Sequence, residues 1–425
     1  MAGERQPGGG PVPTPVPLRR NRDYVLLWSG QVVSSLGSAV SGVAFPLLVL
    51  SLSGSPAQAG LVGFAGTLPY LLVPLPAGGL ADRWDRRSAM IVADAVRALA
   101  LGSVAVASLA GVLTVVQIAL VAFVEGSLFV LFTAAERSAL PQVVPADQLP
   151  AALAQNEART RGAALAGNPL GGVLFGLGHA VPFAADAASY VASVVSLLFV
   201  RTPFQESREP SGGRLHTEIA EGVRWLWRQP LLRAAAFLVA GSNFVFQALV
   251  LALIVLAQAR GASPATIGVL LGLMGAGGLL GAFVAPGIRR RAGPRAVIIG
   301  VNWLWAALLP LFAVVPWPLA MGVLAGGLAL AGPAWNVVLS DISLRLTPDE
   351  LRGRVSGVQG LVAWGPIPLG SLLGGLLLQW IGGVPTVLVL AGVMALVAVA
   401  ATVSPAVRHA PDFRQAAVAG GTPGR

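Results

Sequence analysis

Long uninterrupted apolar runs are the feature that most limits what this chain can fold into. No charged side chain occurs between Tyr24 and Ala81, and the 425-residue sequence is 55% apolar and only 11% charged. A soluble domain carries about 25% charged residues, whereas a helix that crosses a bilayer needs about 20 consecutive apolar residues. The pattern therefore predicts an all-α membrane protein.

Charge-poor runs of this length fall into two sets. We expect spanning helices over residues 24–50, 57–79, 88–111, 114–135, 152–177 and 181–200, and then over 232–258, 265–287, 295–315, 317–340, 353–379 and 384–404. These twelve spans predict two six-helix bundles, at 23–200 and 231–405. A cytoplasmic linker (201–230) would join them, and disordered cytoplasmic tails (1–22 and 406–425) would flank them.

Arginines predict the orientation of the spans. With twelve crossings, the arginine-rich loops all fall on one side of the membrane, and the loops of the other side carry only Arg260. Because basic loops are retained in the cytoplasm, we expect both termini to be cytoplasmic and the chain to lie in the cell inner (plasma) membrane. Within the linker, Ile219, Val223, Leu226 and Trp227 have helical spacing. They predict an amphipathic helix that either lies on the inner leaflet or packs on the protein.

The two halves repeat. The stretch Asp147-Gln148-Leu149 parallels Asp349-Glu350-Leu351, and at the same offset Gly172 corresponds to Gly374. Two similar halves in the same orientation enclose a cavity at their pseudo-twofold axis, which is a common plan for secondary transporters.

The loop between the second and third expected spans carries the most specific motif. Its Gly78-x-Leu80-Ala81-Asp82-Arg83-x-x-Arg86-Arg87 resembles the loop signature of the major facilitator superfamily, with Asp85 in place of the usual Gly. Residues 139–145, 155–159, 168–172, 186–190 and 221–226 are similar to the macrolide-efflux and enterobactin-exporter-like branch, often actinobacterial. The resemblance implies proton antiport with alternating access, exporting small amphipathic molecules such as a drug, an antibiotic or a secondary metabolite. A siderophore exporter, an importer of the same fold, and a non-transporting sensor or scaffold remain alternatives.

The same loop is a candidate gate, formed by Gly78, Asp82, Arg83, Arg86 and Arg87. Asp82 can pair with Arg86 and face the amino terminus of the 353–379 helix, whose dipole favours a carboxylate. That contact would hold the cytoplasmic side shut. Alternatively, the arginines only fix the topology and touch lipid phosphates.

Ionisable side chains within the spans are the next candidates, because they are costly at membrane depth. Glu125 lies near the middle of its span with no basic residue within one helical turn. Removal from water favours the neutral form of such a carboxyl group, so Glu125 is the leading candidate for proton coupling or for binding a cationic substrate. Alternatively, it stays permanently protonated and bonded to a neighbouring helix. Asp94 and Arg97 form an i,i+3 pair, and Glu157 forms an i,i+4 pair with Arg161. Either pair could take part in coupling or be structural.

By analogy with the superfamily, the cavity is lined by the first, fourth, seventh and tenth spans. The candidate substrate-binding residues there are Gln31, Phe129, Phe132, Asn243, Phe246, Gln247, Trp335 and Asn336, and Trp364 could join them. Such a mixture of aromatic and amide side chains suits large, mostly apolar molecules. Asn243 and Asn336 are the stronger candidates among these, because an unpaired amide in lipid is costly.

Several classes of function are excluded. The sequence has no cysteine, and its three histidines lie far apart, so we expect neither a metal nor another cofactor. It has no lysine, which excludes an ATP-binding phosphate loop, and we find no nucleophile and base that would indicate an enzyme. The arginines lie at helix ends rather than on one face, which argues against nucleic acid. The expected partners are a small-molecule substrate, protons and membrane lipids, and we expect a monomer.

Overall fold

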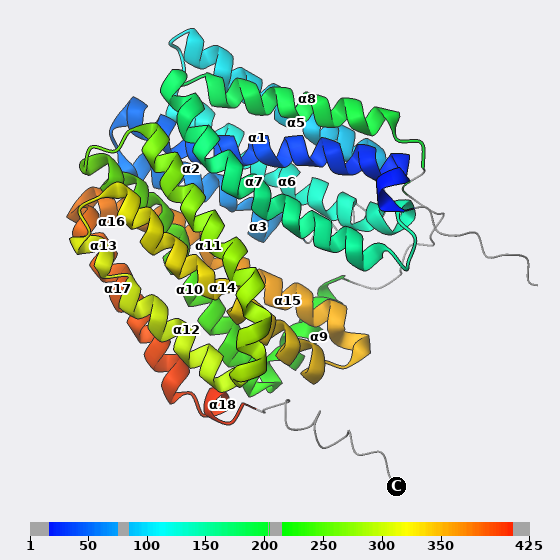
Figure 1. Cartoon of the computed structure of the whole chain (residues 1–425), viewed down its shortest axis with the longest axis vertical. Helices are drawn as coiled ribbons and strands as arrows, with labels where there is room; N and C mark the ends of the chain where they lie inside the picture. The colour runs from blue at the N-terminus through cyan, green and yellow to red at the C-terminus, as the bar shows by residue number, and fades with distance from the viewer. Residues whose placement is uncertain (1–16, 75–84, 203, 205–214, 411–425) are drawn as a thin grey trace, which may run out of the picture.

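The computed structural model describes residues 17–74, 85–202, 204 and 215–410. Within these ranges the chain forms helices and no strand. The helices form two bundles that touch along one part of their length and diverge from it, as the ribbon shows (Figure 1). The all-α fold with two helical bundles expected from the sequence is confirmed.

The N-terminal bundle begins after a short 3-10 helix, η1 (Leu18–Arg20). Its helices are α1 (Arg22–Ser53), α2 (Pro56–Thr67), α3 (Pro69–Leu72), α5 (Arg86–Leu109), α6 (Val115–Val143), α7 (Leu149–Leu177) and α8 (Val181–Phe199). Their starts follow from local capping. The side chains of Asn21, Ser55 and Thr114 each accept a hydrogen bond from a backbone N–H in the first turn, which satisfies donors that a helix cannot pair internally.

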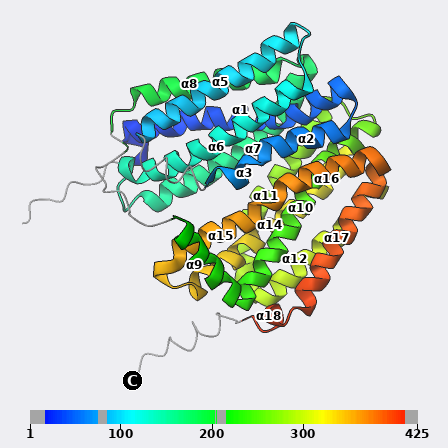
Figure 2. The ribbon, with the colours of Figure 1, turned by 180° about the vertical axis from the view of Figure 1, so that it is seen from behind.

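The linker helix α9 (Leu215–Arg228) leads into the C-terminal bundle. That bundle contains α10 (Pro230–Ala259), α11 (Pro264–Arg291), α12 (Pro294–Leu308), α13 (Leu311–Val314), α14 (Pro318–Leu346), the 3-10 helix η2 (Asp349–Leu351), α15 (Arg352–Trp364), α16 (Pro366–Ile381), α17 (Gly383–Val403) and α18 (Pro405–Arg408). Seen from behind, α9 lies beside α15 (Figure 2). The helix therefore packs on the protein, as one of the two sequence interpretations allowed.

Ten helical segments in the described chain are long and apolar enough to cross a membrane. The expected spans at 57–79 and 152–177 are not among them. The first is interrupted: α2 ends at Thr67, α3 begins at Pro69, and residues 75–84 lie outside the described residues. The second, α7, is one continuous helix that carries Glu157, Arg159 and Arg161. The span at 353–379 is similarly divided into α15 and α16 before Pro366, because proline cannot donate the helical hydrogen bond and clashes with the preceding turn.

Two glycine contacts join the bundles where they touch. An added Cβ atom on Gly172 of α7 would lie 2.9 Å from the Cα atom of Gly268 on α11, and one on Gly375 of α16 would lie 2.7 Å from the Cα atom of Gly60 on α2. The two helix pairs are related by the internal repeat. Gly374, which aligns with Gly172, faces Ala248 within its own bundle instead. Both close approaches depend on the absence of a side chain.

Candidate functional site

A cavity of about 700 Å³ lies between the two bundles. Its N-terminal wall comes from α1, α2, α3, α5, α6 and α7, and its C-terminal wall from α10, α15 and α16. Every ionisable group on the wall, except the phenol of Tyr70, belongs to α5, α6 or α7; the C-terminal wall contributes Gln247, Val250, Leu251, Ile254, Trp364 and Ser371. The cavity is therefore polar and charged on one side and largely apolar on the other.

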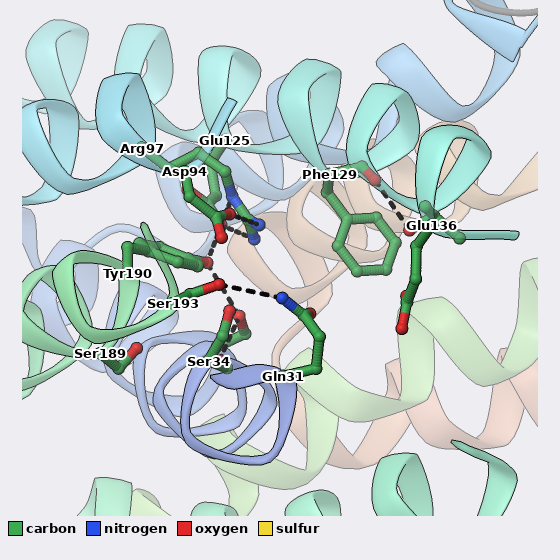
Figure 3. Close-up of polar contacts among 12 residues, drawn as sticks. Gln31, Ser34, Asp94, Arg97, Glu125, Phe129, Glu136, Ser189, Tyr190 and Ser193 are labelled. Atoms are coloured by element: carbon green, nitrogen blue, oxygen red, sulfur yellow. Dashed lines mark hydrogen bonds and ion pairs between the residues drawn. The ribbon is translucent and has the colours of Figure 1, made fainter. Parts of the chain in front are cut away.

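Glu125 lies on this wall and is bound to a neighbouring helix. Its Oε1 atom accepts hydrogen bonds from Arg97 Nη2 at 2.5 Å, Arg97 Nε at 3.0 Å and the Tyr190 hydroxyl at 2.5 Å (Figure 3). Its Oε2 atom is buried without a hydrogen-bond partner. The absence of a basic residue within one turn of α6 therefore does not leave Glu125 unpaired, because α5 places beside it a guanidinium group that lies 28 residues away in sequence.

Arg97 is shared between two acids. Its Nη1 atom also lies 3.3 Å from Asp94 Oδ1, which confirms the predicted i,i+3 pair. The side chains of Arg97 and Asp94 are 3% and 0% exposed, and the guanidinium group stacks 4.0 Å from the centre of the Tyr190 ring. Charges this deeply buried remain stable only if they are paired and hydrogen-bonded. The geometry thus gives one cation two competing carboxylate partners.

Serines extend this network into α1 and α8. The hydroxyl groups of Ser38 and Tyr190 are 2.8 Å apart, and Gln31 donates to Ser193 at 2.9 Å. Asp186 is fully buried and accepts from Ser41 at 2.5 Å and from Ser189 at 3.0 Å. These bonds tie Asp186, which lies on α8, to α1. Through Tyr190 and Arg97, Glu125 on α6 is therefore connected to Ser38 on α1, to α5 and to α8.

A second buried ion pair was missed by the sequence reading. Arg159 of α7 donates to both carboxylate oxygens of Glu136 on α6, at 2.8 and 3.3 Å, and both residues line the cavity. The spacing Glu125, Phe129, Phe132, Glu136 puts all four on one face of α6, and Phe129 lies between the two acids (Figure 3). This spacing is the sequence signal that could have placed Glu136 on the cavity wall. The expected span ended at residue 135 and so excluded Glu136, whereas α6 continues to Val143.

Aromatic rings close the wall where the bundles meet. The Tyr70 ring on α3 lies 5.8 Å from Phe129 on α6 and 5.2 Å, edge-on, from Trp364 on α15. All three rings line the cavity. Tyr70 follows Pro69 directly, and Trp364 ends α15 two residues before Pro366. Among the described residues, the only aromatic pair between the bundles therefore lies where both helices are interrupted.

The predicted substrate-binding residues divide into two groups. Gln31, Phe129, Phe132 and Gln247 line the cavity, together with Trp364, whereas Asn243, Phe246, Trp335 and Asn336 do not. Asn243 donates to the backbone oxygen of Ala363 at 2.7 Å. Phe246 and Trp335 both pack against Trp305, and Asn336 is exposed away from the cavity. The preference for the two asparagines is therefore wrong, because neither lines the cavity. Which face of a helix points into the cavity depends on packing that composition does not reveal.

The predicted gating loop is only partly described. Gly78, Asp82 and Arg83 lie outside the described residues. Arg86 is buried and donates to the backbone oxygens of Ser138 and Phe204, and Arg87 donates to those of Leu197 and Leu198. These four carbonyls lie in or beside α6 and α8. The two arginines therefore fasten the start of α5 within the N-terminal bundle, and neither reaches the C-terminal one.

Glu157 forms its predicted pair with Arg161, at 2.7 Å, but its side chain is 63% exposed. It lines the cavity in the half of α7 that begins at Leu149, far from the glycine contact at Gly172. This position does not resemble that of Glu125, which is only 15% exposed.

A cavity between two helical bundles that are related by an internal repeat defines a membrane transporter of the two-bundle type. A family model described as transmembrane secretion effector matches residues 14–419. The chain belongs to this family of the major facilitator superfamily, which includes efflux pumps, and is a multi-pass transporter rather than an enzyme.

Relatives and solved structures agree with this assignment. The chain is 28% identical to a multidrug efflux pump, Tap, of Mycolicibacterium fortuitum over 91% of this chain and 96% of that protein. It is 29% identical to macrolide efflux protein A of Streptococcus pyogenes over 30% and 31% of the two chains. The fold is similar to nucleoside transporter NupG (TM-score 0.73, 14% identity, 92% and 100% covered) and to an inward-facing bacterial homologue of ferroportin (TM-score 0.71, 15% identity, 91% and 99% covered).

Proposed function

We propose that this chain exports small amphipathic organic molecules, such as a drug, an antibiotic or a secondary metabolite, by proton antiport with alternating access. The observation that carries the proposal is the Arg97 guanidinium group held between Asp94 and Glu125 on the wall of the cavity. A cation with two carboxylate partners can remain paired when one of them takes up a proton. A proton can therefore bind without leaving an unpaired charge in the membrane, which would be expensive.

The shape of the cavity supports an amphipathic substrate. Val250, Leu251 and Ile254 give the C-terminal wall an apolar surface, and Gln247 on the same wall supplies an amide, bonded to Ser371 at 2.9 Å. Pockets of this kind bind apolar bodies and orient them through a few polar groups. A scaffold that kept the fold without transport would be expected to fill this volume with side chains, so the open cavity favours transport.

The arrangement of the bundles supports an inward-facing state. The glycine contacts close the cavity at one end, whereas the bundles diverge toward the end where α1 begins (Figure 1). With cytoplasmic termini, as the arginine distribution indicates, that open end faces the cytoplasm. Alternating access would then require the glycine contacts to separate as the open end closes.

The coupling cycle follows from these positions. In the present state Glu125 pairs with Arg97 while a substrate enters from the cytoplasm. After the change to the outward-facing state, a proton from outside binds Glu125, Arg97 remains with Asp94, and the substrate leaves. The proton is released to the cytoplasm when the cavity opens inward again. The names of the Tap and macrolide efflux relatives support this direction over import.

Transport by the full chain in proteoliposomes tests the proposal. An acidic lumen should drive uptake of an amphipathic dye by molecules whose cytoplasmic side faces the bath, and dissipation of the pH gradient should abolish it. Uptake driven only by an alkaline lumen would instead favour an importer that moves substrate and protons together. No flux for any substrate of a chemically varied panel would support the scaffold.

A further inference from the structure

We propose that α9 binds the headgroups of anionic phospholipids and thereby holds the first half of the α15–α16 span in place. The site would be formed by residues 220–237, which do not line the cavity. One face of α9 is committed to the protein. Leu226 is 2% exposed, and an added Cβ atom on Gly222 would lie 2.8 Å from the backbone oxygen of Arg354. Arg354 also donates to the carboxylate of Glu221.

The rest of α9 has the composition of a membrane-surface helix. Val223 and Trp227 are 41% and 54% exposed, and Arg224 and Arg228 beside them are exposed as well. A helix with apolar and basic side chains on its outer surface binds at the boundary between headgroups and acyl chains. Each arginine near an anionic leaflet makes the free energy of membrane binding more favourable, and this contribution decays within a Debye length of the surface.

The contacts of Trp227 show where the bilayer begins. Its ring lies 5.8 Å from that of Phe237, which is 57% exposed and lies on the membrane-spanning helix α10. Arg233 donates to the backbone oxygen of Trp227 at 3.1 Å, and its guanidinium group lies 6.0 Å from the Trp227 ring. The outer surface of α9 is thus continuous with a helix surface that needs lipid, which favours a bilayer over a soluble protein as the occupant.

These positions define a headgroup site. Tryptophan is enriched at headgroup depth. Arg233 contacts Trp227, and Arg224 and Arg228 are exposed within one turn of it on α9. A lipid whose headgroup carries a net negative charge fits there better than a lipid with a zwitterionic headgroup. Because Glu221 and Gly222 contact Arg354 on α15, lipid bound to α9 would also restrain that helix.

Lipid binding can be measured without transport. Full chain is reconstituted in phosphatidylcholine nanodiscs with or without phosphatidylglycerol, and quenching of Trp227 by brominated phosphatidylglycerol is obtained as the difference between wild type and W227F. We expect stronger quenching by brominated phosphatidylglycerol than by brominated phosphatidylcholine. The double variant Arg224→Gln, Arg228→Gln should weaken apparent phosphatidylglycerol binding about 30-fold. A matched variant, Arg290→Gln and Arg291→Gln on the exposed end of α11, should change the lipid binding reported by Trp227 less than threefold, because these arginines are not part of the α9 surface that Trp227 monitors.

Several results would overturn the proposal. These are equal quenching by both lipids, an unchanged double variant, or equal losses in the two double variants. Competition by inorganic phosphate in detergent, at the same concentration as lipid, would point to a phosphate site instead. A further consequence, faster transport in phosphatidylglycerol, rests on the proposed function. If binding is selective but no flux occurs, the transport proposal fails while the lipid site stands.

Discussion

The sharpest test of the coupling scheme is Glu125→Gln. The substitution keeps the size of the side chain and an oxygen for Arg97 and Tyr190, but it removes the group that would carry the proton. A gradient of about one pH unit stores about 1.4 kcal/mol per proton. For one proton exchanged per neutral substrate, a gradient of about two units would therefore support about 100-fold accumulation at equilibrium. Without a titratable group, the expected ratio is about 1.

The assay is uptake of a neutral amphipathic substrate into proteoliposomes with an acidic lumen, compared with counterflow, in which unlabelled substrate inside exchanges with label outside. We expect Glu125→Gln to lose gradient-driven accumulation and to retain counterflow, which shows that the variant is folded. Glu157→Gln is the matched control, because its 63% exposed side chain lies outside the proposed coupling pair, and it should accumulate substrate normally. Wild-type accumulation by Glu125→Gln would refute the reasoning.

Stability provides an independent check on the pairing. After Glu125→Gln, Arg97 still has Asp94 at 3.3 Å, so the loss should be modest. Arg97→Gln instead leaves two buried carboxyl groups without their cation, and breaking a buried pair in this way costs about 3–5 kcal/mol. In detergent, the Tm of Arg97→Gln should therefore be well below that of Glu125→Gln. The opposite order of the two Tm values would contradict the shared-cation geometry.

Three further predictions follow from single positions. Gly375→Ala places a Cβ atom 2.6 Å from the backbone oxygen of Pro56 and should hold the closed end apart. Labelling of an engineered cavity cysteine from outside should increase, but not in Gly392→Ala, where nothing lies within 4 Å. Trp364→Ala removes the ring contact with Tyr70 and should raise KM for aromatic substrates about fivefold, from roughly 1 kcal/mol per ring pair; exposed Trp380→Ala should not. Asp85 caps α5, and its side-chain hydrogen bond with Ser88 lowers the pKa of its carboxyl below the usual 3.8, against the opposing effect of burial. Asp85→Ala should cost about 1 kcal/mol at neutral pH. Because a lowered pKa stabilises only the ionised form, this difference should disappear as acid protonates the folded carboxyl below pH 3.8.

Much of the fold could be predicted because its signals are local. Apolar run length gives the spans, and capping residues such as Ser55 and Thr114 give their starts. The Asp94–Arg97 pair was predictable because three residues on one helix are always neighbours. Pro69 and Pro366 could have indicated divided helices. Each lies inside an apolar run long enough to be taken as one continuous span, so the interruptions were not predicted.

The site was harder because its decisive contacts cross between helices. Which face of α5 meets α6 depends on the rotation of both helices about their axes, and no local pattern gives that rotation. Arg97 therefore looked like a partner for Asp94 alone, and Glu125 looked isolated. The same lack of information placed Trp335 and Asn336 in the cavity, whereas packing turns one into the C-terminal bundle and leaves the other on its surface.

The charged network and the contacts between the bundles lie in different places, and this limits how protonation can move the bundles. The charged network lies in the N-terminal bundle, and the close glycine contacts between the bundles carry no charge. Protonation of Glu125 therefore cannot separate those contacts by direct repulsion. It can act on them only by changing how α1, α5, α6 and α8 pack, or through a substrate that touches both walls. Tyr70 contacts both Phe129 and Trp364, and Arg97, the partner of Glu125, lies 5.8 Å from the Phe129 ring. The substrate is therefore the shorter connection between the proton and the opposite bundle. A substrate too small to reach both Glu125 and Trp364 should accordingly bind without being driven by the pH gradient.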